Sequence, residues 1–438
     1  MTSTTPSPPR SARRPGSTDA EPGRPDRHRL PGRRAERDAL SPWGRWWSRA
    51  PSLRDRSARV PDDDAPAPPH PVGTLNHAVA GPLVGVVVLL TVFGLVMVLS
   101  ASSVSSLHQF GGSTLSTFFR QVVWAGIGAV AFVAASRFDY HRLRRVATPL
   151  LVLTVVLLIA VLVPGVGVNA NGSSRWLGVG PLVFQPAEMA KLSMVLFSAD
   201  LLARRSRHAH RHDVTVRPVM VVVGVLSGLL LLQPKLGTPI ILGAVVLLML
   251  FAAGIRVRGL VPWALLGVVG AVALAFSADY RKERMLAFLD PWKDPLGNGM
   301  QVLQSQVGIA SGGILGVGLG ASRAKWGFLP YAHTDFIFAV VAEETGLLGA
   351  GALIGLFVLL GVFGFRVALR APDLFGMLLA AGITTWLLLQ AFLNIGMALG
   401  VMPITGEPLP FVSAGGSSLV AALLAVGIVT NIARQART

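Results

Sequence analysis

A carboxylate at the edge of an apolar run is the residue in this sequence best suited to chemistry. The stretch 330–346 begins polar and passes into a long apolar run, with Asp335 at the transition. Glu343 and Glu344 follow about two helical turns further in. Ionisable groups at membrane depth are costly unless they face a polar cavity or a partner, which makes them candidates for function. Asp335 could accept a proton from a substrate at the boundary between water and lipid.

Asp335 also has a purely structural explanation. With Thr334 it stands at the start of a predicted helix, where Asp and Thr cap free backbone N–H groups. The helix dipole favours an ionised carboxylate at that position. Asn caps a helix as well as Asp but cannot accept a proton, so an Asp335→Asn variant separates the two roles.

A second candidate group opens another apolar run. Glu188 and Lys191 follow Pro186 and are three residues apart, so they share a helix face and can form an ion pair. Arg175, just upstream, could bind a phosphate or carboxylate through two hydrogen bonds. The residues alone allow a structural ion pair and an interfacial arginine equally well, because buried pairs often serve packing.

The loop 403–418 carries small and polar residues before the last apolar run. Gly415 and Gly416 would let backbone amides approach a ligand closely. Ser417 or Ser418 could cap the following helix. A helix N-terminus with glycines and serines is a ready anion site.

The composition predicts where these residues lie. The chain is 52% hydrophobic and 14% charged, whereas a soluble domain has about a quarter of charged residues. Long apolar runs predict an all-α polytopic membrane protein with about ten transmembrane helices, rather than the short alternating segments of a β-barrel. The predicted spans are 80–101, 118–135, 146–164, 186–203, 216–233, 238–255, 259–277, 336–365, 374–400 and 417–433.

The basic residues predict the orientation of these spans. The net charge is +17, and the basic residues that follow the tail are concentrated in short loops, which indicates topology rather than a nucleic-acid partner. The arginine-rich loops 136–145, 204–217, 255–258 and 366–373 share one side with both termini, so both termini are expected in the cytoplasm. The loops 102–117, 165–185, 278–335 and 401–416 then lie outside.

Two segments outside the spans stand out. Residues 1–76 are rich in Pro, Arg, Ser and Asp, and they predict a disordered cytoplasmic tail in front of a membrane domain formed by 77–438. The large outward loop 278–335 is too apolar in part for a free loop and predicts short interfacial or re-entrant helices. The chain has no cysteine and no glycine-rich nucleotide loop, so neither a disulfide nor ATP chemistry is indicated.

Several motifs together resemble the SEDS family, the group that contains the cell-division protein FtsW and the elongation protein RodA, with FtsW the more similar. The motifs occur in the family's order along nearly all of 80–433. They are Arg175-Trp176, Gln185–Lys191, Asp290–Pro295, Gly299–Ser305, His333–Ala339 with Glu343-Glu344, and Pro403–Ser418.

The resemblance implies a peptidoglycan glycosyltransferase that polymerises lipid II at the outer face of the bacterial cytoplasmic membrane, at the division septum. The implied partners are a class B penicillin-binding transpeptidase, other division proteins and membrane lipids. A divalent cation, Mg²⁺ or Mn²⁺, could help to stabilise the pyrophosphate leaving group, and no nucleotide is implied.

The resemblance also assigns residues. Asp335 matches the family's essential carboxylate and is the expected general base, because the acceptor hydroxyl must lose a proton as it attacks. No residue is assigned as a metal ligand. The expected substrate-binding residues are Arg175, Glu188, Lys191, His333, Thr334, Glu343, Ser413, Gly415, Gly416 and Ser417.

One position departs from the family pattern, and other functions stay open. The block usually written Gln-Pro-Asp-Leu-Gly-Thr has Lys235 in place of the carboxylate, which puts a metal or substrate role of that position in doubt. The alternative functions are a lipid II flippase, an elongation polymerase and a non-enzymatic scaffold that recruits partners through its tail. A carrier would place its polar site near the midplane rather than at one face.

Overall fold

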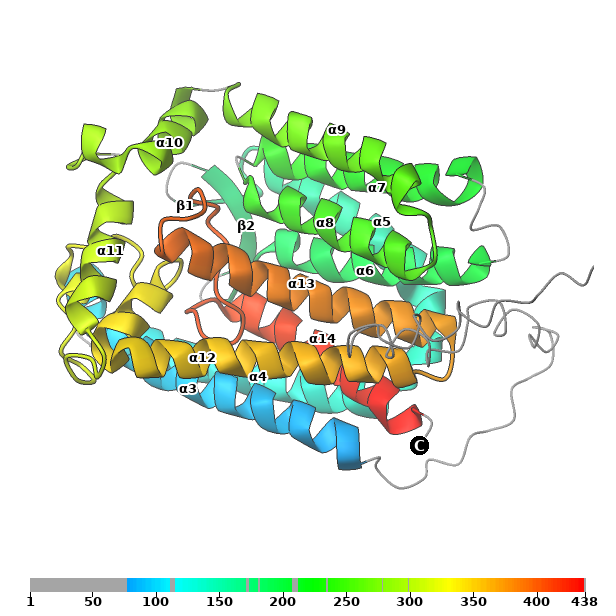
Figure 1. Cartoon of the computed structure of the whole chain (residues 1–438), viewed down its shortest axis with the longest axis horizontal. Coiled ribbons are helices and arrows are strands. Elements are labelled where there is room, and N and C mark those ends of the chain that lie inside the picture. Colours follow the sequence, from blue (N-terminus) through cyan, green and yellow to red (C-terminus); the bar gives the residue numbers. More distant parts are fainter. Residues whose placement is uncertain are drawn as a thin grey trace, which may run out of the picture. The chain divides into compact units, whose positions relative to one another are not determined.

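The computed structural model describes residues 77–110, 115–170, 173–179, 182–206, 212–233, 235–277, 279–297 and 299–436. The predicted disordered tail 1–76 lies outside the described residues. Within the described part the chain is mainly α-helical, and its long helices run side by side as a bundle (Figure 1).

The long helices coincide with the predicted spans. Their ends differ most at α3 and α12, which extend beyond the predicted limits. The bundle consists of α3 (His77–Phe110), α4 (Ser116–Arg137), α5 (Leu143–Leu162), α6 (Pro186–Arg204), α7 (His212–Leu232), α8 (Gly237–Ala252), α9 (Val257–Ala275), α12 (Ile337–Arg370), α13 (Leu374–Ala398) and α14 (Gly416–Gln435).

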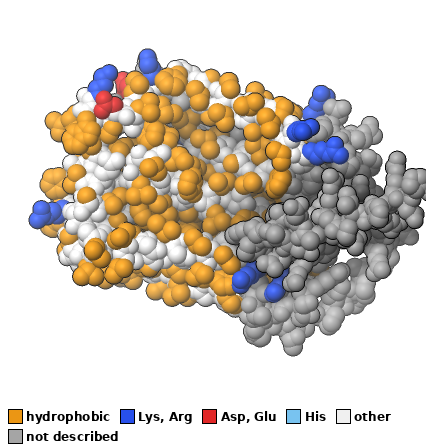
Figure 2. Space-filling model, in the orientation of Figure 1, with side chains coloured by type: hydrophobic (Ala, Val, Ile, Leu, Met, Phe, Trp, Pro, Cys, Tyr) orange, Lys and Arg blue, Asp and Glu red, His pale blue; other side chains and the backbone are white. Residues whose placement is uncertain are grey.

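Hydropathy supports a multi-pass membrane protein. Among the described residues, 7 helices are long and apolar enough to cross a membrane, and α8 and α9 are apolar but shorter. Hydrophobic side chains cover the visible face of the bundle, whereas the Lys and Arg side chains gather towards its ends (Figure 2). Helix α6 differs because it carries Glu188, Lys191, Asp200 and Arg204, and most of its residues are buried inside the protein. The predicted all-α membrane fold is therefore confirmed.

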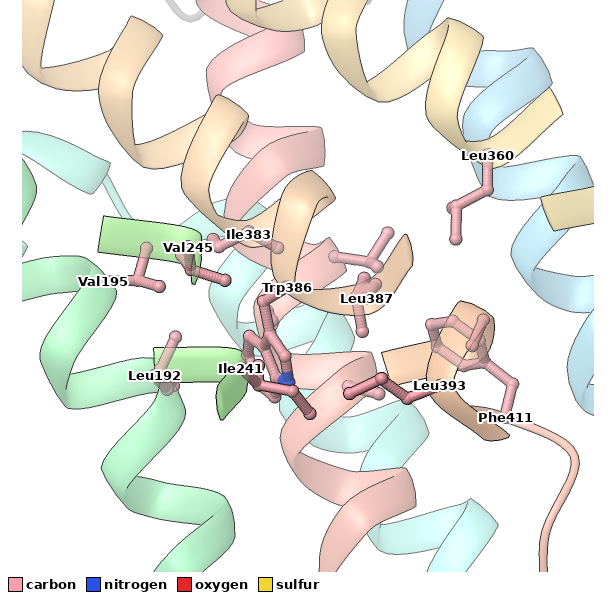
Figure 3. Packing of buried hydrophobic residues seen from close by; sticks show 14 of the residues in the cluster. Leu192, Val195, Ile241, Val245, Leu360, Ile383, Trp386, Leu387, Leu393 and Phe411 are labelled. Atoms are coloured by element: carbon pink, nitrogen blue, oxygen red, sulfur yellow. The ribbon is translucent and has the colours of Figure 1, made fainter. Parts of the chain in front are cut away.

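Helix α13 lies at the centre of the packing. Its Trp386 is 1% exposed and points between α6, with Leu192 and Val195, and α8, with Ile241 and Val245 (Figure 3). Inside a membrane, such contacts stabilise helix association through close packing rather than through release of water. This central helix also carries Gln390 and Asn394, both buried.

One end of the bundle carries most of the irregular structure. A three-stranded antiparallel sheet, β1 (Val168–Ala170), β2 (Ser173–Val179) and β3 (Leu182–Phe184), lies between α5 and α6. The sequence interpretation treats this segment only as an outward loop. The helices α10 (Asp279–Leu289) and α11 (Met300–Gly312) lie at the same end (Figure 1) and confirm the prediction of short helices in 278–335.

The opposite end brings the arginine-rich loops together. The Tyr140 hydroxyl donates to Asp373 Oδ1 at 2.7 Å, and the Tyr140 backbone N–H donates to Asn431 Oδ1 at 3.0 Å. These three residues come from the loop 136–145, the loop before α13 and the last helix. Two of the loops that were predicted to share one side of the membrane, 136–145 and 366–373, therefore lie at one end of the bundle, together with the C-terminal part of α14.

Candidate functional site

A cavity of about 970 Å³ opens at the end of the bundle that carries the sheet. Its lining comes mainly from β2, from α7, α8 and α9, and from the loops before α12 and before α14. One part of the wall is apolar, with residues such as Val223, Ile240, Leu247, Trp263 and Val268. The polar part contains the charged side chains Arg175, Lys235 and Asp335. The cavity can therefore hold a molecule with an anionic or hydroxylated head and a hydrocarbon tail.

Asp335 lines this cavity and is not the N-cap residue of α12. The N-cap residue of α12 is Phe336, which makes no side-chain capping hydrogen bond. The Thr334 hydroxyl donates to the carbonyl of Tyr331 at 3.2 Å instead of capping the helix. Neither Asp335 nor Thr334 is therefore the N-cap residue that the sequence predicts, because the chain turns once more before the helix begins. Asp335 is half-buried, so its carboxylate combines protein contacts with access to the cavity.

Side chains from two other segments fix the turn that carries Asp335. Asn394 Nδ2 on α13 donates to the backbone carbonyl of Asp335 at 2.7 Å and to that of Glu407 at 2.8 Å. The Ser413 hydroxyl donates to the carbonyl of Thr334 at 2.6 Å. The backbone of Tyr331 adopts φ 60°, a conformation that is uncommon for a residue with a side chain and that occurs preferentially at functional sites. The position of Asp335 is thus set by bonds to its own backbone.

His333 and Ser413 support this turn rather than line the cavity. The His333 carbonyl accepts from the Ala414 N–H at 3.0 Å. Burial, together with the charge of Arg120, lowers the pKa of His333 below its usual 6.5. Both residues were expected to bind substrate. Their side chains are absent from the described lining of the cavity, whereas Thr334 belongs to it.

Four buried charged residues form what we call the cavity cluster: Glu188, Lys191, Lys235 and Glu407. Lys191 Nζ lies 2.9 Å from Glu188 Oε2 and 3.2 Å from Glu407 Oε2. Lys235 Nζ lies 3.2 Å from Glu407 Oε1 and 3.9 Å from Glu188 Oε1. The predicted pair Glu188–Lys191 is confirmed. Two cations balance two carboxylates, which is what burial of such charges requires.

Polar side chains complete the cavity cluster. Gln390 Oε1 accepts from Lys191 Nζ at 2.7 Å, and the Thr238 hydroxyl donates to Glu407 Oε1 at 2.5 Å. Burial alone would raise the pKa of Glu407, but Lys191 and Lys235 outweigh burial and hold that pKa at about 2. Sequence reasoning missed Glu407, and the only signal was a carboxylate in an outward loop that is poor in charge.

Arg175 and Gln185 extend the polar wall. Arg175 lines the cavity, and its Nε donates to the carbonyl of Gln233 at 2.9 Å. The backbone N–H of Gln185 donates to the hydroxyl of Ser417 at 3.1 Å, and that hydroxyl donates to the carbonyl of Val183 at 3.3 Å. Ser417 therefore binds the junction between β3 and α6.

The glycine–serine segment before α14 has mixed roles. Gly415 is the N-cap of α14 without any side-chain cap, so the predicted capping by Ser417 or Ser418 is wrong. Gly415 lines the cavity and Gly416 does not. A Cβ at Gly416 would lie 2.4 Å from the indole of Trp124. The absence of a side chain at Gly416 thus serves the contact of α14 with α4.

A second group, the loop cluster, consists of Glu343, Glu344 and Lys325. Glu343 accepts from the Ser322 hydroxyl at 2.5 Å and from the backbone N–H of Arg323 at 2.9 Å. Lys325 Nζ lies 3.4 Å from Glu344 Oε1. None of the three belongs to the described lining of the cavity. Glu343 holds the loop before α12 against that helix, and its expected role in substrate binding stays a prediction.

The described residues do not form a metal site of their own. Among them, no three His, Cys, Asp or Glu side chains are grouped in a way that could hold a metal ion. Asp335 is the one carboxylate among the described residues that line the cavity. Calcium and magnesium sites built by protein alone need several oxygen ligands, which this lining does not offer.

Known proteins resemble this chain in sequence. Residues 82–438 match the cell cycle protein family that comprises FtsW, RodA and SpoVE. The probable peptidoglycan glycosyltransferase FtsW of Geobacter metallireducens is 42% identical over 80% of this chain and 92% of its own length. Stage V sporulation protein E of Bacillus subtilis is 41% identical over 81% of this chain and 97% of its own length.

Solved structures resemble it as well. A chain from a peptidoglycan synthase complex, described as coordinating polymerization and crosslinking, superposes with a TM-score of 0.67 at 36% identity. The rod shape determining protein RodA of Thermus thermophilus superposes with a TM-score of 0.60 at 32% identity. Each match covers 81% of this chain and 97% of the solved chain. The predicted resemblance is confirmed, and the chain belongs to the FtsW/RodA/SpoVE family.

Proposed function

We propose that this protein is a peptidoglycan glycosyltransferase that polymerises glycan strands from lipid II. The observation that carries the proposal is the position of Asp335 in a cavity with both a cationic and an apolar wall. Lipid II combines a sugar head, a pyrophosphate and a polyprenyl tail, and each part has a matching region in this cavity. Relatives that are 42% and 40% identical carry the name probable peptidoglycan glycosyltransferase FtsW.

The proposed reaction joins the sugar of an acceptor to the anomeric carbon of a donor. Asp335 takes the proton from the 4-hydroxyl of the acceptor as that oxygen attacks. The bond between the anomeric carbon and the pyrophosphate breaks with inversion, and the lipid pyrophosphate leaves. Arg175 lines the same cavity and can stabilise the charge that develops on the leaving group.

The bound lipids would leave the cavity along its apolar wall. The side chains of α7, α8 and α9 that line the cavity are mostly aliphatic, with small residues Gly224, Gly243 and Gly267 among them. Helix α9 is exposed along most of its length, for example at Leu266 and Val269. Polyprenyl chains in this region would contact both the cavity wall and the surrounding membrane.

The proposed location follows from the two ends of the bundle. The arginine-rich end faces the cytoplasm with both termini, and the cavity opens on the outer face. This arrangement supports a polymerase over a flippase, because a carrier would hold its substrate near the midplane. The division septum and other division proteins are the proposed setting, by similarity to relatives named FtsW.

The proposed partner is a class B penicillin-binding transpeptidase. The similar solved chain is part of a peptidoglycan synthase complex described as coordinating polymerization and crosslinking. A polymerase that makes glycan strands outside the membrane requires a crosslinking enzyme on the same side. A divalent cation, Mg²⁺ or Mn²⁺, would accompany the pyrophosphate of the substrate, and Asp335, the one carboxylate among the described lining residues, could contact it.

Asp335→Asn tests the catalytic role. The full-length protein in detergent, with its transpeptidase partner, should make polymer from lipid II, and the variant should lose at least 10²-fold in rate, the usual contribution of a general base. The fold should persist, because Asp335 is not the N-cap residue of α12 and Asn could replace it at a helix start in any case. Asp373→Asn is the matched control, since Asp373 caps α13 at the opposite end by accepting from the Gly376 N–H.

Equal polymerisation by wild type and Asp335→Asn would contradict the base assignment. Flipping of labelled lipid II in vesicles without any polymer, unaffected by the substitution, would instead support a carrier. If Asp373→Asn lost as much activity as Asp335→Asn, the loss could be explained by removal of any carboxylate near a helix end. The result would then not support a catalytic role of Asp335.

A further inference from the structure

Lys235 is a buried lysine that nevertheless lines the cavity. Its side chain is 4% exposed, and it belongs to the cavity wall together with Arg175 and Asp335. Lysine is almost never fully buried unless it is paired. The other lysine of the cavity cluster, Lys191, is absent from the described lining. Of the two lysines in the cavity cluster, Lys235 is therefore the one placed to meet a molecule in the cavity.

The pairing within the cavity cluster leaves donor capacity on Lys235. Lys191 already contacts both Glu188 and Glu407, at 2.9 and 3.2 Å. The Lys235 ammonium has one carboxylate oxygen at 3.2 Å and a second at 3.9 Å, beyond hydrogen-bond distance. An ammonium group carries three N–H donors. At least one of them is available to a molecule in the cavity.

A second cation is tied to the same turn of the chain. Arg175 Nε donates to the carbonyl of Gln233 at 2.9 Å, two residues before Lys235, and Arg175 also lines the cavity. Arg175 therefore lines the cavity from the sheet, and Lys235 lines it from the segment just before α8. The hydrogen bond of Arg175 to Gln233 connects the two segments. Two fixed cations from different elements suit a ligand with two adjacent anionic groups.

We propose that Lys235 binds the pyrophosphate group of the lipid-linked donor, with Arg175 beside it. The inference rests on the proposed function and extends it to a position where the family pattern has a carboxylate. A fixed ammonium there adds to the positive charge of Arg175 on the same cavity wall. The ligand chemistry is a pyrophosphate carried on a long apolar chain.

The test measures binding rather than catalysis. The full-length protein in detergent is titrated with undecaprenyl pyrophosphate, with undecaprenol and with inorganic pyrophosphate, and the affinities are compared by calorimetry. Wild type should prefer the lipid pyrophosphate over the alcohol. Lys235→Met should weaken binding of the lipid pyrophosphate by about ten- to a hundredfold, the usual worth of hydrogen bonds to a charged group. Binding of the alcohol should stay unchanged.

Two further variants keep the result interpretable if Lys235→Met fails to fold. The double variant Lys235→Met with Glu407→Gln removes one charge of each sign and keeps the cavity cluster balanced. It should fold and still lose the preference for pyrophosphate. Lys325→Met is the matched control, because Lys325 is equally buried at 4% exposure but belongs to the loop cluster. Its variant should retain the preference of wild type.

The outcomes separate this inference from the proposed function. A folded double variant that binds the lipid pyrophosphate as tightly as wild type would overturn the role of Lys235. Equal affinity for inorganic pyrophosphate would overturn the assignment to a lipid-borne group. The wild type could bind the lipid pyrophosphate through Lys235 and yet make no polymer from lipid II. That result would support this inference and contradict the proposed function.

Discussion

The cavity cluster and the loop cluster contain the same residue types but differ in what surrounds them. Both hold two buried glutamates and at least one lysine near the end of the bundle that carries the sheet. The carboxylates of the cavity cluster are neutralised mainly by ammonium groups, and one of its lysines lines the cavity. Glu343 of the loop cluster is held by a hydroxyl and backbone N–H groups.

The difference shows that burial of charge does not by itself identify a functional residue. A carboxylate that accepts several backbone N–H bonds is satisfied locally and fixes a loop. A carboxylate between two lysines can hold one of them at the wall of a cavity, where that lysine can meet a ligand. We therefore propose that the loop cluster serves stability and that the cavity cluster serves both stability and binding.

The largest effect is expected from breaking the cavity cluster at Lys191. Lys191→Met leaves Glu188 and Glu407 with Lys235 alone, and Lys235 lies 3.9 Å from Glu188. An uncompensated buried charge costs about 3–5 kcal/mol. We expect a large loss of stability in thermal unfolding in detergent, together with loss of polymerisation.

Lys325→Met sharpens the comparison because it removes the lysine of the loop cluster. Glu344 keeps the Ser100 hydroxyl at 2.6 Å and the backbone N–H of Ser322 at 3.3 Å, so the loss of stability should be smaller. If Lys325→Met destabilised the protein as much as Lys191→Met, the distinction between the two clusters would fail.

A smaller effect is expected from Glu343→Gln. The amide keeps the size of the side chain. It places an N–H₂ group, which cannot accept, where Glu343 now accepts hydrogen bonds from the Ser322 hydroxyl and the Arg323 backbone N–H. Loss of a hydrogen bond to a charged group costs about 1.5–3 kcal/mol. We expect lower thermal stability with nearly unchanged affinity for the lipid pyrophosphate. A variant with wild-type stability and weakened lipid binding would move Glu343 back among the substrate-binding residues.

The two clusters also mark how far sequence reasoning reaches. The helices were predictable because length and hydropathy decide whether a segment can cross a membrane. The pair Glu188–Lys191 was predictable because residues three apart share a helix face. Two further residues contact that pair from distant parts of the chain. Glu407 lies 216 residues after Lys191, and Lys235 lies just before α8. Such contacts depend on tertiary packing, which no local spacing encodes.

The errors at the helix ends have a related cause. Asp335 and Ser417 both have residue types and positions typical of caps. In the fold, the Ser417 hydroxyl forms hydrogen bonds with the backbone of Gln185 and Val183. The turn at Tyr331 places the start of α12 at Ile337, after Asp335. The strands β1–β3 were likewise unpredictable, because β1 and β3 are only three residues long.

The smallest predicted effect concerns His333, in the loop that leads from the loop cluster to Asp335. Its pKa is lowered by burial and by Arg120, so the folded protein binds a proton less readily than the unfolded chain. Stability should therefore be fully present above pH 6.5, the ordinary pKa of the residue, and should fall as the pH drops below it. Thermal unfolding between about pH 7.5 and 5.5 should show this loss in wild type and less of it in His333→Gln.

The substitution should leave the turn intact, because the backbone carbonyl of residue 333 accepts from the Ala414 N–H in both proteins. Equal pH dependence in both proteins would mean that His333 does not report on the packing around Asp335.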